Sequence, residues 1–249
     1  MERNEMEKVL EVHNLFRNGI LNNVSFDVKK GELLAIMGPS GSGKSTLLYH
    51  VSGLEHIEGG LVVIDGTNIG EMTEDELADF RLTKTGFIFQ QMNMMEGLDL
   101  LDNILLPAYH ACRTKTEKRQ KRERALVLMK KMQIASLAHR EVSKVSGGQL
   151  QRACICRSLI NDPEILFADE PTGALNRRGA MDIMSELQRL SSEGTTILMV
   201  THDSKVAGFC DRVLYLLDGR IKGELTFPDV RKQSEKEEQI ITWLQELGW

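Results

Sequence analysis

The stretch ELLAIMGPSGSGKST, residues 32–46, decides the fold. It begins with an apolar run that is typical of a buried strand and ends in a glycine-rich loop, after which TLLYHVSGL (46–54) is typical of a helix. From Gly38 to Ser45 the loop fits the pattern G-x-x-x-x-G-K-[ST], which binds phosphate when a strand precedes it and a helix follows. We therefore predict a phosphate-binding loop at residues 38–46.

Each part of this loop has an expected role toward a nucleotide. Glycines let the backbone curl so that its N–H groups point inward at a helix N-terminus, where they hold phosphate oxygens. Lys44 would reach the β- and γ-phosphates, and the Ser45 hydroxyl would ligate Mg²⁺. The predicted nucleotide-binding residues of the loop are Gly38, Pro39, Ser40, Gly41, Ser42, Gly43, Lys44, Ser45 and Thr46.

A second stretch, LFADEPTGALNRRG (166–179), places Asp169 and Glu170 side by side at the end of an apolar run. In nucleotide hydrolases with a phosphate loop, an acidic residue at the end of a neighbouring buried strand holds Mg²⁺, and Asp169 fits this role through a metal-bound water. Successive strand side chains point to opposite faces, so Glu170 needs the turn at Pro171 to face the space beyond the γ-phosphate. There Glu170 would orient and polarise an attacking water as a general base.

The composition is that of a soluble globular protein. The 249 residues are 41% hydrophobic and 27% charged, and the formal net charge of −5 argues against nucleic-acid binding. No apolar run reaches the roughly 18–20 residues that span a bilayer, and MERNEMEKVLEV (1–12) lacks the apolar core of a signal peptide. We expect a cytoplasmic chain that reaches the inner face of the cell membrane only through a partner. The cysteines form no C-x-x-C pair and are expected to act as small apolar residues: Cys112, Cys154, Cys156 and Cys210.

Apolar strands alternate with helical patterns along most of the chain, which favours a parallel sheet covered on both faces. Strands are expected at 59–66, 85–90, 164–170 and 195–203, with a hairpin at 212–225 through Asp218-Gly219. Residues 91–145 are helical and rich in Met, and seven Lys or Arg between 113 and 124 are expected on a solvated helix face, with lipid headgroups or an acidic partner as the alternative. The tail 228–249 has the spacing of an amphipathic helix, either packed on the domain or contacting a partner.

Four further motifs accompany the phosphate loop. VSGGQLQR (145–152) looks like the ABC signature, GFIFQ ends at Gln90 like a Q-loop, VTHD carries His202 like a switch histidine, and FADEP is similar to a Walker B motif with its catalytic glutamate. Each motif is weak alone, but together and in this order they are specific. The sequence therefore resembles the ATP-binding subunit of an ABC transporter over nearly its whole length.

The resemblance implies an α/β fold: a P-loop NTPase (RecA-like) core with an antiparallel β subdomain and an inserted α-helical subdomain. The core would take residues 1–90 and 146–227, the helical subdomain 91–145, and a C-terminal amphipathic helix 228–249. Two copies would bind ATP and Mg²⁺ head to tail, with the phosphate loop of one copy facing the signature of the other. The implied roles are a γ-phosphate contact for His202, metal contact and signalling for Gln90, and γ-phosphate binding by the signature residues Ser146, Gly147, Gly148 and Gln149.

The segments FRLTKTGFIFQ, NILLPAY and ADEPTGALN look like the ATPases of the macrolide-export and lipoprotein-release group. Within it, GALN and CDRVLYLLDGRI are most similar to the bacitracin-resistance type, whose polytopic permeases handle antimicrobial peptides. Lipoprotein release and macrolide efflux are the nearest alternatives. A non-transport ABC ATPase and a P-loop kinase are the other classes, and the signature together with Glu170 argues against the kinase.

Three features depart from the family pattern or extend it. Phe16 is the only nearby aromatic that would stack on adenine, and a place in a strand core is the alternative. Asn176 stands where the D-loop usually ends in Asp, keeping the hydrogen-bonding shape without the charge. The methionines that follow Gln90 either line a groove for a permease helix or fill the core: Met92, Met94 and Met95.

Overall fold

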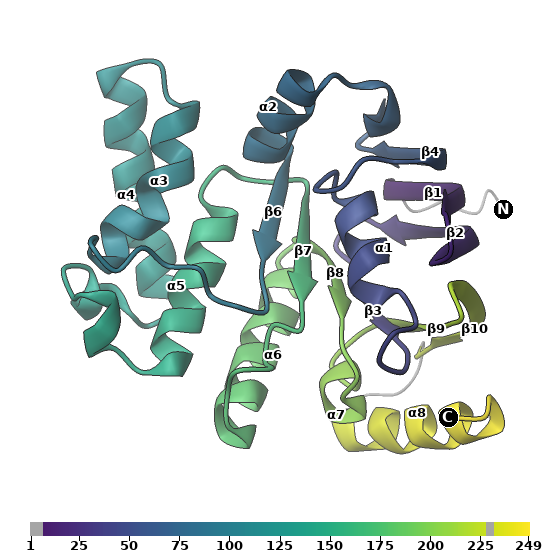
Figure 1. Cartoon of the computed structure of the whole chain (residues 1–249). Helices are drawn as coiled ribbons and strands as arrows, with labels where there is room; N and C mark the ends of the chain where they lie inside the picture. The colour runs from purple at the N-terminus through teal and green to yellow at the C-terminus, as the bar shows by residue number, and fades with distance from the viewer. Residues whose placement is uncertain (1–6, 228–231) are drawn as a thin grey trace, which may run out of the picture.

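A computed structural model describes residues 7–227 and 232–249 of the chain. Within them the strands form two sheets, a smaller one ordered β2-β1-β4-β5 and a larger one ordered β10-β9-β3-β8-β7-β6 (Figure 1). The smaller sheet is antiparallel and contains β1 Lys8–Arg17, β2 Leu21–Lys29, β4 Gly59–Ile64 and β5 Thr67–Asn68. The start of the tail segment predicted for 228–249 lies outside the described residues, as does 1–6.

The larger sheet carries the phosphate loop. Its strands β6, β7, β8, β3 and β9 run parallel, and β10 at the edge pairs antiparallel to β9. Every residue of β3, β7 and β8 is buried, which explains their continuous apolar sequences. Because carboxyl ends of parallel strands meet at one edge, the loops that follow β3, β7 and β8 converge there. The strands are β3 Leu33–Met37, β6 Thr85–Ile88, β7 Ile165–Asp169, β8 Thr196–Val200, β9 Arg212–Leu217 and β10 Arg220–Thr226.

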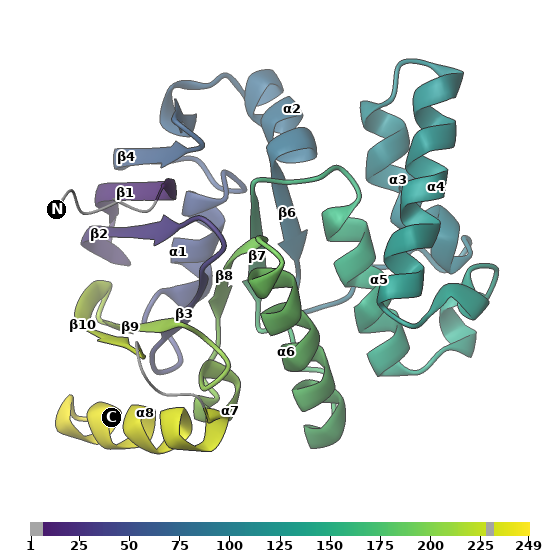
Figure 2. The ribbon, with the colours of Figure 1, turned by 180° about the vertical axis from the view of Figure 1, so that it is seen from behind.

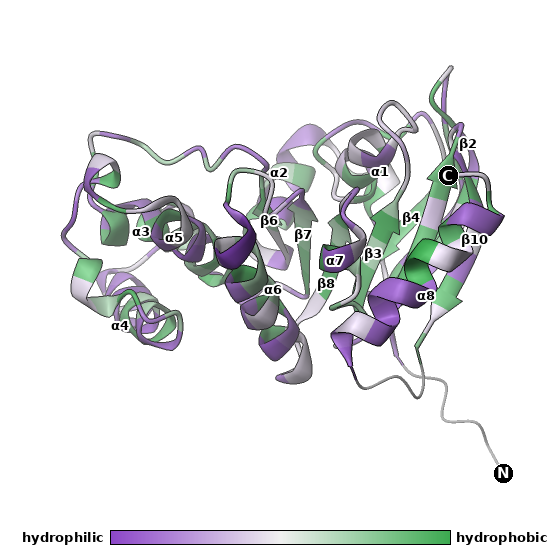
Figure 3. Ribbon diagram, turned by 90° about the horizontal axis from the view of Figure 1, so that it is seen from below, coloured by the Kyte–Doolittle hydropathy of each residue, from purple (hydrophilic) through white to green (hydrophobic). Residues whose placement is uncertain are grey.

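Helices cover both faces of this sheet. In the view from below, α1 lies on one side of β3, and α6, α7 and α8 lie on the other (Figure 3). Helices α3, α4 and α5 stand beside β6, away from the smaller sheet (Figures 1 and 2). The helices are α1 Lys44–Val51, α2 Glu74–Lys84, α3 Leu100–Ala111, α4 Lys115–Lys131, α5 Gly147–Leu159, α6 Arg177–Ser192, α7 Ser204–Ala207 and α8 Gln233–Glu246.

The larger sheet separates two apolar cores. Leu33 and Met37 of β3 belong to the core that holds the buried residues of α3 to α8, whereas Leu34 and Ile36 belong to the core under α1 and the smaller sheet. This division follows from the alternation of side chains along a strand. The architecture agrees with the α/β fold expected from the sequence.

Local sequence signals set several element boundaries. The helix expected over 46–54 begins at Lys44 and ends at Val51, and the strand expected to reach position 203 ends at Val200. The predicted hairpin is present, with φ of 50° at Asp218 and 70° at Gly219. Both values lie in the left-handed region that a two-residue hairpin turn of this type needs.

The basic segment 113–124 lies at the start of α4 and is largely exposed, as predicted for a solvated helix face. Lys121 and Arg124 bend back and donate hydrogen bonds to the Ile160 carbonyl at the end of α5. None of the helices in residues 7–227 and 232–249 is long and apolar enough to cross a membrane. Three cysteines are buried, as expected for small apolar residues: Cys154, Cys156 and Cys210. The fourth, Cys112, is half-buried.

Arg212 on β9 is a buried cation that ties the two sheets together. Its guanidinium donates to Glu32 Oε1 at 2.7 Å, to Glu224 Oε1 at 3.1 Å and to the carbonyl oxygen of Asp27 on β2. The side chains of Arg212 and Glu32 are only 8% and 10% exposed. Removing one partner of such a pair leaves the other charge buried without compensation.

We predict that Arg212→Leu lowers the free energy of unfolding by about 3 kcal/mol, measured by urea denaturation. Arg220→Leu is the matched control, because Arg220 is exposed on the edge strand β10. The control should stay within about 0.5 kcal/mol of the unmodified protein. Equal losses for the two variants would contradict a special role for the Arg212 cation.

Candidate active site

The loop between β3 and α1 is shaped by two glycines. A Cβ atom on Gly38 would lie 2.2 Å from the carbonyl oxygen of Leu216, so no side chain fits there. Gly43, which precedes the first residue of α1, has a φ of 99°, a conformation that glycine adopts without strain. The loop therefore opens onto the first turn of α1, whose backbone N–H groups lack helical partners. The remaining predicted residues lie in this loop or turn: Pro39, Ser40, Gly41, Ser42, Lys44, Ser45 and Thr46.

Asp169, the last residue of β7, meets α1 at this edge of the sheet. Its carboxylate is buried, with the residue only 2% exposed. Ser45 donates a hydrogen bond from Oγ to Asp169 Oδ1 at 3.0 Å, and Tyr49 donates from its hydroxyl to Oδ2 at 2.6 Å. Burial and this hydrogen bond raise the pKa of Tyr49 to about 12, so the phenol keeps its proton at neutral pH.

Glu170 turns away from the strand through its own backbone. Its φ is 45°, in the left-handed region, so the turn expected at Pro171 begins one residue earlier. A non-glycine residue in this region costs on the order of 1 kcal/mol or more, and such residues cluster at functional sites. The turn brings Glu170 Oε1 to 2.8 Å from Nδ1 of His202, which follows β8. The structure thus brings both proposed hydrolytic residues together.

Lys44 faces the same edge. Its ammonium donates to the carbonyl oxygens of Gly38 at 2.8 Å and Pro39 at 2.9 Å. Partial burial lowers the pKa of Lys44, and the nearby carboxylates of Glu170 and Asp169 offset part of that effect. One cation and two carboxylates therefore share the site, an arrangement that a polyphosphate and a divalent metal ion would complement.

The residues present fit a magnesium ion. The described residues hold no cluster of three or more His, Cys, Asp or Glu side chains that would bind a metal. In nucleotide hydrolases Mg²⁺ is held by one or two protein oxygens together with phosphate oxygens and waters. Ser45 Oγ and the Asp169 carboxylate supply that kind of oxygen donor at the mouth of the phosphate loop.

The signature residues lie elsewhere in the chain. Ser146 caps α5: its Oγ accepts from the Gln149 N–H, and its own N–H donates to Gln149 Oε1 at 2.9 Å. While it caps the helix, the Ser146 hydroxyl still has a proton to donate. Ser146, Gly147, Gly148 and Gln149 line a hollow of about 450 Å³ together with Asn176. Helices α5 and α1 lie on opposite sides of β6 and β7 (Figures 1 and 2), so the structure does not bring this hollow to the chain's own phosphate loop.

Phe16 lies beside the phosphate loop. It stands near the end of β1 and is 45% exposed, so the alternative of a core position is wrong. Its ring borders a hollow of about 360 Å³ that Gly41 also lines. An exposed ring can stack on a base, and the stacking role of Phe16 stays a prediction.

Residues 21–173 match the family described as ABC transporter. The chain belongs to the ABC transporter family. Its architecture is the ATPase cassette of this family, as the sequence predicted: it matches the dimeric structure of the cassette MJ0796 with a TM-score of 0.79 and 38% identity, over 89% of this chain and all of that one.

Two curated relatives narrow the group. The chain is 38% identical over 221 residues to the bacitracin export ATP-binding protein BceA of Halalkalibacterium halodurans, covering 88% of this chain and 86% of BceA. It is 39% identical over 219 residues to the macrolide export protein MacB of Mannheimia succiniciproducens, covering 86% of this chain. It spans only about a third (34%) of that MacB protein. The ABC cassette is thus of the MacB and BceA-like group, and the predicted resemblance is confirmed.

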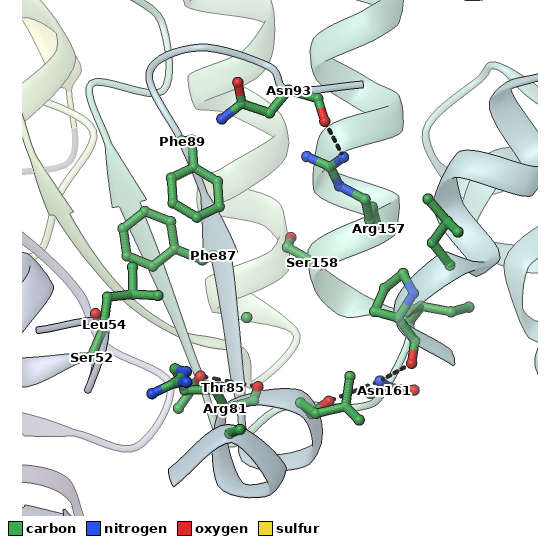
Figure 4. A pocket seen from close by; sticks show the side chains of 16 residues that line it. Ser52, Leu54, Arg81, Thr85, Phe87, Phe89, Asn93, Arg157, Ser158 and Asn161 are labelled. Carbon is green, nitrogen blue, oxygen red and sulfur yellow. Dashed lines mark hydrogen bonds between the residues drawn. The ribbon is translucent and has the colours of Figure 1, made fainter. Parts of the chain in front are cut away.

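The cassette has a groove between its core and its helical region. The groove has a volume of about 480 Å³, and Leu54, Phe87, Phe89 and Pro107 are among its lining residues. Figure 4 shows the two phenylalanine rings side by side on one wall and Arg157, bound to the Asn93 carbonyl, on the other.

The groove does not have the methionine lining that was one of the two alternatives for Met92, Met94 and Met95. The residues around it include none of Met92, Met94 and Met95. Met94 packs against the core, Met95 is exposed, and the Met92 carbonyl accepts a hydrogen bond from Arg157 at 2.8 Å. The aromatic residues Phe87 of β6 and Phe89 after it form the wall instead.

Gln90 lies next to the turn after Glu170. Its Nε2 is 3.8 Å from the position that a Cβ on Gly173 would take. Within residues 7–227 and 232–249, Gln90 makes no hydrogen bond to Ser45 or Asp169, so its metal contact stays a prediction.

Two residues that contact the candidate site were not predicted from the sequence. Tyr49 binds Asp169, and the buried Gln151 of α5 donates to the Pro171 carbonyl at 2.7 Å. Tyr49 lies four positions after Ser45, a spacing that places both on one helix face and could have drawn attention to it. For Gln151 no such signal exists, because its partner is 20 residues away in the sequence.

We predict that Phe16→Ala weakens ATP binding about tenfold, since base–aromatic stacking contributes roughly 1–3 kcal/mol. An equilibrium titration with ATP measures this. Leu61→Ala on β4 is the control, because Leu61 is also an exposed apolar residue and lies outside the hollow. Unchanged ATP affinity of Phe16→Ala would remove Phe16 from the site.

Proposed function

We propose that this cassette hydrolyses ATP with Mg²⁺ between two head-to-tail copies of itself and thereby powers export by a membrane permease. The observation that carries the proposal is the convergence of Lys44, Asp169 and the Glu170–His202 pair at the phosphate loop. The relative MJ0796 supports it, because structures of that protein are dimeric and one is a post-hydrolysis state with ADP and Pi.

Each residue of the candidate active site would have its own role in phosphoryl transfer. Lys44 and the N–H groups of the loop would hold the phosphates, while Ser45 and Asp169 would hold Mg²⁺, which neutralises developing charge on the phosphate oxygens. Glu170 would accept a proton from the attacking water as it approaches the γ-phosphate in line. His202 would hold the Glu170 carboxylate in position and contact the γ-phosphate.

The second copy would supply the signature. Ser146, Gly147 and Gly148 line a hollow of their own, so they are available to the γ-phosphate of a partner's ATP. Asn176 lies in the same hollow and caps α6, its Oδ1 accepting from the Gly179 N–H at 2.9 Å. Because Asn and Asp cap helices about equally well, Asn176 would preserve the shape of the D-loop while it removes a charge from the dimer interface.

The groove of about 480 Å³ would receive a cytoplasmic helix of the permease. Its apolar wall of Leu54, Phe87 and Phe89 suits the apolar face of an amphipathic helix. Phe87 lies on β6 and Phe89 directly precedes Gln90, so a helix seated there would lie close to the residue proposed to report on the nucleotide.

We predict that Glu170→Gln lowers ATP turnover of the transporter complex by a factor of 100 or more, because the glutamine cannot accept the proton of the water. ATP binding should persist, since Lys44 and the phosphate loop are unchanged. Glu164→Gln at the start of β7 is the matched control, because Glu164 pairs with Lys84 away from the site. Near-normal hydrolysis by Glu170→Gln would refute the general-base role.

The transported compounds would be antimicrobial peptides of the bacitracin kind. Support comes from the GALN and CDRVLYLLDGRI segments and from the similarity to BceA. Cells that carry Glu170→Gln should then lose protection against such peptides and keep their susceptibility to macrolides unchanged. A change confined to macrolides would favour efflux of the MacB type, and a defect in lipoprotein release would favour the third alternative.

We predict that Leu54→Asp reduces co-purification of the cassette with its permease about tenfold or more, because it places a charge in the apolar wall of the groove. ATP affinity of the isolated cassette should not change. Leu126→Asp on α4 is the control, since Leu54 and Leu126 are 39% and 41% exposed. Equal co-purification of the two variants would place the permease elsewhere.

A further inference from the structure

Tyr49 contacts the active-site carboxylate from a position that the phosphate-loop pattern does not include. The pattern ends at Ser45, and Tyr49 follows one helical turn later on the same face of α1. As a result, α1 gives one hydrogen bond to each oxygen of Asp169: Ser45 Oγ binds Oδ1 at 3.0 Å and the Tyr49 hydroxyl binds Oδ2 at 2.6 Å.

The position of the Tyr49 hydroxyl is set by packing as well as by the hydrogen bond. Its ring lies 5.8 Å from the ring of Phe87 on β6, and Phe87 in turn packs against Phe167 of β7. Strand β7 is the strand that ends at Asp169. The half-buried Tyr49 is therefore held at two points, by Phe87 at its ring and by the Asp169 carboxylate at its hydroxyl.

A carboxylate that acts on a metal through water must keep its plane in one orientation. The last bond of an Asp side chain rotates easily, and such a rotation would turn the oxygen that faces Ser45 out of position. A second donor on the other oxygen opposes this rotation, because the carboxylate plane is then fixed by Ser45 and Tyr49 together. Partners of this kind, which hold a metal-binding carboxylate without touching the metal, typically change metal affinity or activity about 10- to 100-fold when they are lost.

We propose that Tyr49 is a positioning residue of the magnesium site, whose hydroxyl holds Asp169 Oδ2 so that Oδ1 faces Ser45 and the metal. This inference rests on the proposed function, in which Ser45 and Asp169 hold Mg²⁺. Tyr49→Phe is the direct test, because it removes only the hydroxyl and keeps the ring contact with Phe87.

The experiment measures the affinity of the full chain for a fluorescent ATP analogue, once with Mg²⁺ and once with EDTA. The ratio of the two dissociation constants gives the contribution of the metal. Tyr49→Phe should reduce this ratio about tenfold and leave the affinity in EDTA unchanged. The Mg²⁺ concentration for half-maximal ATPase activity should rise by a similar factor.

Two further variants separate the possible outcomes. Tyr109→Phe is the matched control: Tyr109 lies on α3 under Lys118, and its change should leave the ratio intact. Asp169→Asn should abolish the metal contribution; if it behaves like the unmodified chain, the proposed magnesium site itself fails. If Asp169→Asn behaves as expected but Tyr49→Phe stays within twofold of the unmodified ratio, or weakens binding equally in EDTA, the positioning role of Tyr49 is overturned.

Discussion

The carboxylate of Asp169 is buried at the end of a central strand, and a buried charge must be surrounded by donors or cations. Ser45 and Tyr49 provide the donors from α1, and Lys44 provides a cation at the head of the same helix. This requirement holds α1 against the end of β7. Because α1 follows β3 through the phosphate loop, it also holds that loop over the carboxyl edge of the larger sheet.

The parallel sheet makes this arrangement possible. Strand β8 lies between β3 and β7, so the loops after all three strands end at one edge with their side chains in reach of one another. His202 arrives from β8 and Glu170 from β7, and the left-handed backbone of Glu170 turns its carboxylate toward the histidine. The Glu170 N–H remains tied to the Val200 carbonyl at 3.1 Å, which anchors the strained residue to β8. The strained backbone of Glu170, the proposed general base, is thus held by the same sheet that carries His202.

Strand β6 contributes both to the surroundings of Tyr49 and to the groove on the outside of the cassette, because its Phe87 contacts Tyr49 and lines the groove. Phe87 touches Tyr49 on the inner side and Phe89 on the groove side, with ring centroids 5.8 and 4.3 Å apart. The larger sheet therefore has two distinct borders: one that surrounds Asp169 with polar donors, and one with the apolar wall that we propose as the docking site of a permease helix. Helices α3 and α5 close the far side of the groove, and α4, which lies beside α3, bears the solvated basic face (Figure 1).

The sequence alone predicted those features that depend on local pattern. The phosphate loop, the acidic pair at the end of β7 and the Asp218-Gly219 hairpin each follow from residue types at fixed spacing, and the resemblance to ABC transporter subunits arranged them into a cassette. Tertiary structure decided what depends on residues distant in the chain. It placed Phe16 on the surface beside the loop, lined the groove with phenylalanines and not with the methionines after Gln90, and brought Tyr49 to Asp169 across 120 positions of sequence. A spacing pattern reports which residues share a strand, a turn or a helix face, whereas the partner of a buried polar group is set by how separate elements pack against one another.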